Sequence, residues 1–160
     1  DPDIQSNHKI RALLQRTNNA TLIMARLAND ISSLIRELDT GVRTNTLLNL
    51  CQEEIAKATT PPKHDLNTLL NQLCKSKQTS DNTQIIADIR ELIETFKIIE
   101  KAFDFWEAQL KIIQDCEEEC KTLLPSPQNM KLAAAIHTLY EGNKKLLLMY
   151  IIMNKFKGVT

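Results

Sequence analysis

The first forty residues carry apolar side chains at alternating spacings of three and four. The repeat runs through Ile10, Leu13, Thr17, Ala20, Met24, Leu27, Ile31, Leu34 and Leu38. This spacing gathers the side chains on one face of a helix, which is the pattern of a bundle or coiled-coil helix. We predict a helix from about Ile4 to Leu38, ended near Gly41, because glycine readily adopts the left-handed conformation that follows many helices.

Two adjacent prolines interrupt the second apolar segment. Helical spacing is present in residues 47–55 and again in residues 66–75, on either side of Pro61-Pro62. Proline lacks a backbone donor and clashes with the preceding turn, so this segment is two short helices or one helix broken at Pro61-Pro62. The polar stretch that follows, residues 75–82, is predicted to be a loop.

The third segment holds the longest repeat in the chain. Apolar residues keep the alternation over nearly six heptads, with Phe103 and Trp106 among them and Glu117 as the one exception. No Gly or Pro lies in residues 83–124, so the pattern predicts one continuous helix of about 60 Å at a rise of about 1.5 Å per residue. Aromatic residues at these spacings pack in a core, whereas Phe105 lies off the repeat and either packs against a flanking helix or is exposed.

A final helix is predicted over residues 128–157, after a turn forced by Pro125 and Pro127. Four helical segments of comparable length, joined by short links, are typical of antiparallel neighbours. We therefore predict an all-α fold, an antiparallel up-down-up-down four-helix bundle with long heptad-patterned helices, the second broken at Pro61-Pro62. The short links argue against the cytokine type of bundle, which needs two long crossovers.

The amino-acid composition supports an all-α fold with few turns between its helices. Three glycines and five prolines in 160 residues leave little room for the turns of a sheet protein. A chain of this length fits one domain, so residues 1–160 are interpreted as a single helical bundle domain. The chain starts without an initiator methionine, so we expect a fragment of a longer protein or a processed form. Its longest apolar run has eight residues, far below the roughly 20 needed to span a bilayer.

No motif in the sequence names a reaction. The Glu-x-x-His, His-Glu-x-x-His, Gly-x-Ser-x-Gly and phosphate-binding glycine patterns are absent, which predicts a non-enzymatic protein without a cofactor. Cys116 and Cys120 are spaced four apart and share one helical face, as two metal ligands or a redox pair would. The preferred interpretation is structural, because Cys120 falls on the heptad repeat as a small core residue and Cys116 flanks it. The three histidines lie in different segments with no shared spacing, so no metal site is expected.

The C-terminal helix carries the strongest functional signal. Residues 146–153 are apolar without interruption and cover every side of a helix, which is more than one bundle face requires. Lysines flank this run on both sides, as in segments that dock into grooves or lie at membrane interfaces. The alternative is a terminal helix buried on several sides in this chain or in a larger assembly. The candidate contact residues are Lys144, Lys145, Leu148, Met149, Ile152, Met153, Lys155, Phe156 and Lys157.

Charge is balanced over the chain, with 20 basic and 20 acidic side chains, but it is sorted along it. Residues 83–124 hold five basic and ten acidic side chains, a net charge of −5, whereas residues 125–160 hold five and one, a net charge of +4. This sorting predicts attraction between neighbouring helices, or a basic end for an acidic partner or anionic lipid. No basic patch interleaved with aromatic residues is present, so nucleic acid is not expected as a partner.

Together these patterns predict a helical protein-interaction domain of scaffold, adaptor or effector type, which binds through a bundle surface near the C-terminal helix. The partner is expected to be another protein, helical or acidic, and self-association through the heptad faces is a further option. The alternative function is a module that binds phosphoinositides or an anionic membrane surface through its lysine-flanked apolar segment. Four sparse cysteines fit a reducing compartment, so a cytoplasmic location is expected, although a secreted mature chain fits the sequence too.

Overall fold

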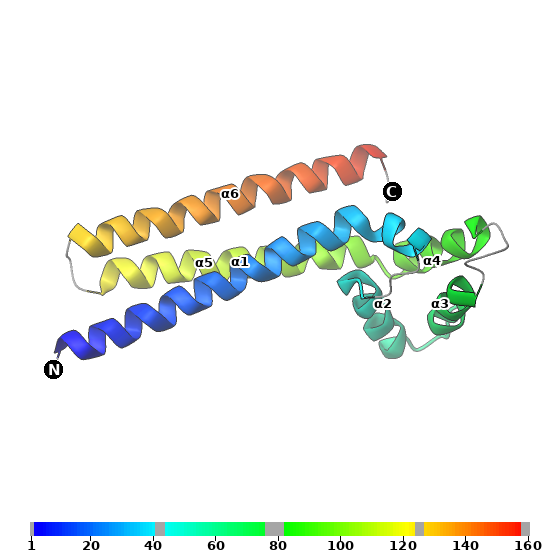
Figure 1. Ribbon diagram of the computed structural model, residues 1–160, viewed down its shortest axis with the longest axis horizontal. Helices are drawn as coiled ribbons and strands as arrows, with labels where there is room; N and C mark the ends of the chain where they lie inside the picture. Colours follow the sequence, from blue (N-terminus) through cyan, green and yellow to red (C-terminus); the bar gives the residue numbers. More distant parts are fainter. Residues whose placement is uncertain (1, 41–43, 76–81, 124–126, 158–160) are drawn as a thin grey trace. The chain divides into compact units, whose positions relative to one another are not determined.

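The computed structural model describes residues 2–40, 44–75, 82–123 and 127–157, and it describes the side chains of residues 7–40, 44–75, 82–123 and 127–154. Every regular element among these residues is a helix (Figure 1), which confirms the predicted all-α class. The helices are α1 (Pro2–Thr40), α2 (Thr46–Lys57), α3 (Leu66–Lys75), α4 (Thr83–Thr95), α5 (Ile98–Thr122) and α6 (Pro127–Lys157). A four-helix bundle is not confirmed, because the described residues form six helices.

The chain divides into two compact units. Unit 1 combines Asp1–Ala25 with Phe103–Phe156, and unit 2 combines Arg26–Ala102 with Lys157–Thr160. Unit 1 therefore contains the first part of α1, most of α5 and nearly all of α6, whereas unit 2 contains the rest of α1, the start of α5 and the whole of α2, α3 and α4. The single domain predicted for residues 1–160 stays a prediction.

Three helical segments make up unit 1, and consecutive ones run in opposite directions (Figure 1). Its core takes buried side chains from each of them: Leu13, Ala20, Met24, Trp106, Leu110, Ile113, Ala133, Ile136 and Leu147. Trp106 is fully buried, and its ring centroid lies 5.8 Å from that of Tyr150 on α6. Its neighbour Phe105 is exposed rather than packed against another helix.

The exception in the predicted repeat, Glu117, is a buried carboxylate with two basic neighbours. Its oxygens lie 3.1 Å from Nδ1 of His137 on α6 and 3.3 Å from Nζ of Lys121. Burial acts to raise the pKa of Glu117, but the hydrogen bonds from His137 and Lys121 outweigh it, so this pKa lies below its usual value. The polar interruption of the apolar repeat thus coincides with a polar link between α5 and α6.

The helix break expected at Pro61-Pro62 is present in unit 2. α2 is followed by Ala58 at φ −69° and ψ 136°, an extended conformation, and α3 begins beyond the prolines. Asp65 caps α3, because its carboxylate accepts hydrogen bonds from the backbone N–H (2.9 Å) and the hydroxyl group (2.7 Å) of Thr68. The predicted break is therefore confirmed.

A buried polar network joins α1 to α2 in unit 2. Asp30 accepts hydrogen bonds from the backbone N–H of Thr46 (2.9 Å), from the hydroxyl group of the same residue and from Nε of Arg26 (3.1 Å). Asn45 caps α2 by accepting from the N–H of Leu47 (2.9 Å), and its amide donates to the carbonyl oxygen of Asp30 (2.8 Å). Both Asp30 and Asn45 are buried, so these bonds offset the desolvation of their polar groups.

The continuous helix predicted for residues 83–124 is wrong, because the chain turns between α4 and α5. Lys97 adopts a φ of 51°, in the left-handed region that ends many helices. The N–H of Phe96 still donates to the carbonyl oxygen of Leu92 (3.0 Å), whereas that of Lys97 reaches back only to the carbonyl oxygen of Glu94 (3.1 Å). The series of α-helical hydrogen bonds therefore stops here.

Packing on both sides of this turn supplies the physical reason. Adjacent apolar residues are buried together, Leu92 with Ile93 before the turn and Ile98 with Ile99 after it. In one straight helix these four side chains would spread over more than half of the circumference, with Ile93 and Ile98 on opposite flanks. The turn at Lys97 allows both flanks to be buried.

Two other helix boundaries agree closely with the predicted ones. α1 ends at Thr40, two residues beyond the predicted end, and α6 begins at Pro127, one residue before the predicted start. The predicted helix terminator Gly41 lies outside the described residues. Within the described part of the chain, no helix is both long and apolar enough to cross a membrane.

Candidate functional site

The outer face of α6 carries four of the candidate contact residues. The inner face of this helix consists of buried and half-buried residues at spacings of three and four: Asn129, Ala133, Ile136, Tyr140, Asn143, Leu147, Tyr150 and Asn154. At about 100° per residue, Leu148, Met149, Ile152 and Met153 lie on the opposite side. We call these four residues the outer α6 patch. Their exposed fractions are 49%, 49%, 54% and 42%, respectively.

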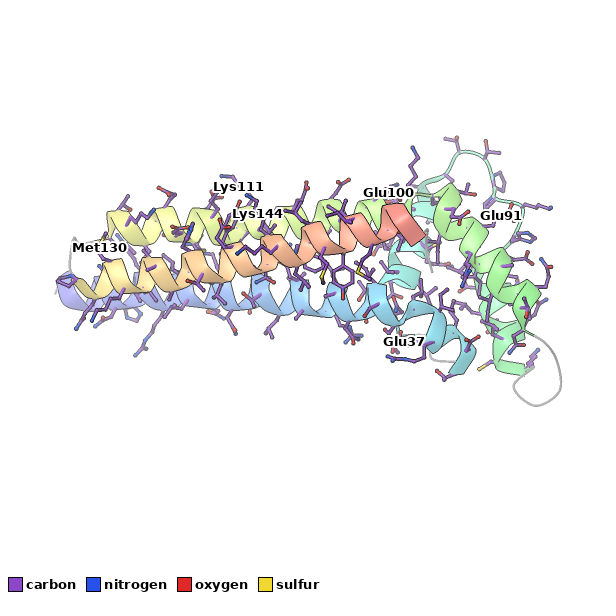
Figure 2. All side chains as sticks on the ribbon, turned by 90° about the horizontal axis from the view of Figure 1, so that it is seen from above. Glu37, Glu91, Glu100, Lys111, Met130 and Lys144 are labelled. Carbon is purple, nitrogen blue, oxygen red and sulfur yellow. The ribbon has the colours of Figure 1, made fainter. Side chains whose placement is uncertain are left out.

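The apolar run of residues 146–153 is thus divided between two faces. Leu147 is buried and Leu146, Tyr150 and Ile151 are half-buried, whereas the outer α6 patch is exposed. In Figure 2, α6 lies in front of the other two helical segments of unit 1, and its outer side faces the viewer. Among the described residues the run is therefore buried on one side only.

A groove between α5 and α6 adjoins the patch. Its volume is about 240 Å³, and its lining residues are Glu107, Leu110, Lys111, Gln114, Tyr140, Lys144, Leu147 and Leu148. Nζ of Lys144 lies 5.8 Å from the centroid of the Tyr140 ring, within the range of a cation–π contact. Lys111 on α5 and Lys144 on α6, both labelled in Figure 2, line this groove. The groove therefore combines apolar side chains with two lysines and with Glu107, and Leu148 belongs to both the groove and the patch. Lys111 is paired with Asp115 at 2.7 Å, whereas Lys144 lies over the Tyr140 ring.

In the part of the chain whose side chains are described, exposed large apolar side chains lie in unit 1 alone. Among the described residues these are Leu14, Leu22, Ile23, Phe105, Ile112, Met130, Leu139 and the outer α6 patch. The large apolar side chains described in unit 2 are buried or half-buried. Contiguous exposed apolar surface marks an interaction site, whereas single exposed residues are ordinary. The outer α6 patch, with four such side chains in six residues, is the densest group.

Of the five remaining candidate contact residues, the structure describes the side chains of two. Lys144 and Lys145 are exposed on α6, one turn before Leu148. The side chains of Lys155, Phe156 and Lys157 lie outside the described residues.

Cys116 and Cys120 are both fully buried on α5. The thiol of Cys120 donates a hydrogen bond to the carbonyl oxygen of Asn129, with Sγ at 3.5 Å, and burial raises the pKa of this thiol above its ordinary value. In the described part of the chain, neither cysteine belongs to a group of three His, Cys, Asp or Glu ligand atoms within 4.8 Å of one another. The structure thus places both thiols among core side chains.

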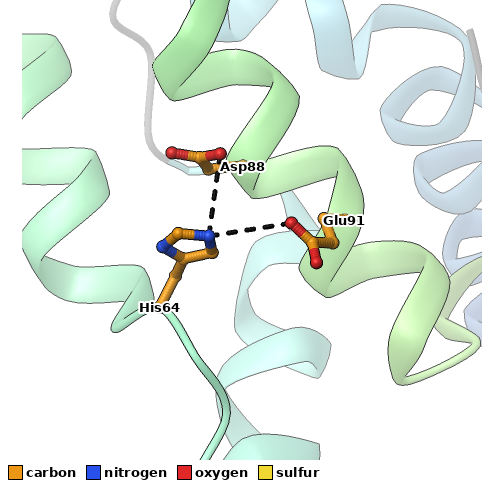
Figure 3. Close-up of side chains that lie close together, drawn as sticks. All are labelled: His64, Asp88 and Glu91. Carbon is orange, nitrogen blue, oxygen red and sulfur yellow. Dashed lines mark ion pairs between the residues drawn. The ribbon is translucent and has the colours of Figure 1, made fainter.

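One cluster of potential metal ligands was missed from the sequence. His64, on the segment between α2 and α3, lies beside Asp88 and Glu91 of α4 (Figure 3). Its Nε2 lies 3.7 Å from Oδ1 of Asp88 and 3.6 Å from Oε2 of Glu91. The three-residue spacing of Asp88 and Glu91 is visible in the sequence. The position of His64 beside them is not predictable from the sequence, because it depends on how α3 packs against α4.

Two features of the described chain qualify as sites by their geometry: the outer α6 patch with its groove, and the cluster of His64, Asp88 and Glu91. No protein-family model, curated protein or solved structure matches this chain. The functional interpretation therefore rests on the chain's own residues.

Proposed function

We propose that this chain is a non-enzymatic helical interaction module whose outer α6 patch binds an acidic, amphipathic helix of a partner protein. The patch itself is the observation that carries the proposal. Four large apolar side chains lie together on the solvent side of a helix whose opposite side packs in the core. A helix on the surface of a globular protein needs one apolar face, whereas this part of α6 has two.

The apolar area of the patch limits the affinity it can supply. Full burial of one Leu, Ile or Met side chain contributes about 1.5–3 kcal/mol. Each patch side chain is about half exposed, so covering all four contributes roughly 3–6 kcal/mol before the cost of association. Tight binding therefore also requires contacts in the adjoining groove and with the nearby lysines.

The charge of the C-terminal segment that carries the patch favours an acidic partner. Residues 125–160 carry a net charge of +4, and Glu141 is their only acidic residue. Rim charges of this kind select the partner and raise the association rate. A helix with apolar residues at spacings of three and four, flanked by Asp or Glu, matches both the patch and the lysines. The unbranched side chains of Met149 and Met153 adapt to apolar partners of different shape.

An anionic membrane surface is the second candidate ligand. Exposed apolar residues beside Lys144 and Lys145 favour contact with acidic headgroups, as in helices that lie at membrane interfaces. The groove between α5 and α6 favours the protein partner, because side chains of a docked helix fill such a groove and a bilayer surface does not.

A displayed library of helical peptides, selected on the full chain, tests the proposal. Selection is expected to enrich peptides with an apolar helical face and acidic flanks. The double substitution Leu148→Glu/Ile152→Glu should weaken their binding by about tenfold or more, because it places charge in the centre of the contact. The matched control Leu14→Glu/Leu22→Glu alters two exposed leucines of α1 and should bind as the wild type does.

Both double variants are first checked for wild-type helical circular dichroism and cooperative melting. Enriched peptides that bind Leu148→Glu/Ile152→Glu as tightly as the wild type would overturn the proposal. Failure to enrich any helical peptide would overturn it too. In that case, co-sedimentation with phosphatidylserine and phosphoinositide vesicles at low salt, lost in the same variant, would assign the patch to a membrane surface.

A further inference from the structure

In unit 2, one imidazole nitrogen faces two carboxylates. Nε2 of His64 lies 3.7 Å from Asp88 and 3.6 Å from Glu91, and both separations exceed the roughly 3.2 Å upper limit of an N–H···O hydrogen bond. A single ring nitrogen donates at most one hydrogen bond, so it does not satisfy both carboxylates. Nε2 of His64 and one carboxylate oxygen from each of Asp88 and Glu91 therefore face one another, with no hydrogen bond from the imidazole to either carboxylate.

We propose that His64, Asp88 and Glu91 bind a divalent transition-metal ion, with Zn²⁺ as the first choice. Bonds of about 2.0–2.1 Å at tetrahedral angles separate two zinc ligands by about 3.3–3.4 Å. The two separations from His64 exceed this value by a few tenths of an ångström, and all three ligand atoms lie within 4.8 Å of one another. The side chain of Glu91 is 58% exposed, so it has room to move its carboxylate toward the ion.

The surrounding structure holds the ligands in place. Asp88 and Glu91 are three residues apart and project from the same side of α4 (Figure 3). Asp65 caps α3, which fixes the adjacent His64 at the start of that helix, and α3 packs against α4. Nε2 of Gln84 donates a hydrogen bond at 2.8 Å to Oδ1 of Asp88, the same oxygen that faces His64, and so holds this carboxylate in place while Oδ2 stays available to an ion as well. Outer contacts of this kind orient carboxylates that bind metals.

The ligand set selects the class of metal. One imidazole nitrogen and two carboxylate oxygens suit Zn²⁺ and similar divalent transition metals, whereas Ca²⁺ and Mg²⁺ prefer oxygen ligands throughout and Cu⁺ prefers thiolates. Two carboxylates balance the charge of a divalent ion, and three protein ligands leave the fourth tetrahedral position to water. A bound ion would link the segment between α2 and α3 to α4, so it should also raise the melting temperature.

Calorimetric titration of the reduced full chain with ZnCl₂ tests the site. One zinc ion per chain is expected, and His64→Gln, Asp88→Asn and Glu91→Gln should each lower the affinity by about tenfold or more. His137→Gln is the matched control, because His137 also lies beside two carboxylates, but in unit 1. Cys74→Ser removes the exposed thiol as an alternative ligand. Both controls should bind zinc as the wild type does.

Long-range ¹H–¹⁵N spectra of the histidine rings locate the ion without any substitution. Adding ZnCl₂ should shift the ring nitrogens of His64 and leave those of His8 and His137 in place. Unchanged zinc affinity in His64→Gln, no binding at about 100 µM zinc, or shifts confined to another histidine would each overturn the proposal. If circular dichroism shows that His64→Gln has lost its helices, the zinc affinities of Asp88→Asn and Glu91→Gln and the ring spectra of the wild type decide whether the site binds zinc.

Discussion

Asp30 is a charged residue with an exposed fraction of only 2%. Burial acts to raise its pKa, but hydrogen bonds from Thr46 and Arg26 outweigh burial, so the pKa of Asp30 lies below its usual value. The sequence does not reveal this role, because Asp30 stands beside the apolar repeat like any solvent-facing acid. Its partner Thr46 reaches it only once α2 has folded back onto α1.

The low pKa of Asp30 predicts how stability depends on pH. A carboxylate with a folded pKa below its unfolded value stabilises the protein above about pH 4, and this contribution is lost as pH falls through the folded pKa. The free energy of unfolding, measured by urea denaturation from about pH 7 to pH 3, should therefore decrease below about pH 4. Asp30→Asn should lower it by about 1–3 kcal/mol at pH 7 and flatten the decrease.

Asp104→Asn is the control for this measurement, because Asp104 is exposed and should leave both the stability and the pH profile unchanged. A wild-type pH profile in Asp30→Asn would show that another carboxylate is responsible for the decrease. Glu117, whose pKa is also lowered, would then be the next to replace.

At the scale of helices, apolar spacing and proline positions predicted α1, α6 and the break at Pro61-Pro62, because these signals are local to the segments concerned. The turn at Lys97 has no such signal, since no Gly or Pro lies near it and the apolar repeat continues through it. It depends on which side chains the rest of unit 2 buries, and spacing alone does not determine that.

Lys97 should be a strained position, because a residue with a Cβ atom in the left-handed conformation is disfavoured by about 1–2 kcal/mol. Lys97→Gly is therefore expected to raise the free energy of unfolding by roughly 0.5–1 kcal/mol in urea denaturation. Lys131→Gly, on an exposed position of α6, should instead lower it by about 1 kcal/mol. Equal destabilisation by both substitutions would contradict a strained turn.

At the scale of the whole molecule, the candidate contact residues predicted from the sequence include all four side chains of the outer α6 patch, but not the groove beside it. The uninterrupted apolar run of residues 146–153 pointed to the C-terminal helix, and packing within unit 1 then separates buried Leu147 from the outer α6 patch. The cluster around His64 was out of reach because its residues come from two separate segments of unit 2. Local patterns thus pointed to one candidate site and gave no sign of the other.

Methyl NMR of the four methionines tests docking at the outer α6 patch most directly. Met149 and Met153 lie in the patch, Met24 is buried on α1, and Met130 is exposed near the N-terminal end of α6 (Figure 2). Addition of an acidic amphipathic peptide selected on the wild-type chain should shift the methyl signals of Met149 and Met153 saturably and leave the other two in place. Saturable shifts of Met24 or Met130, with Met149 and Met153 unmoved, would contradict docking at this patch.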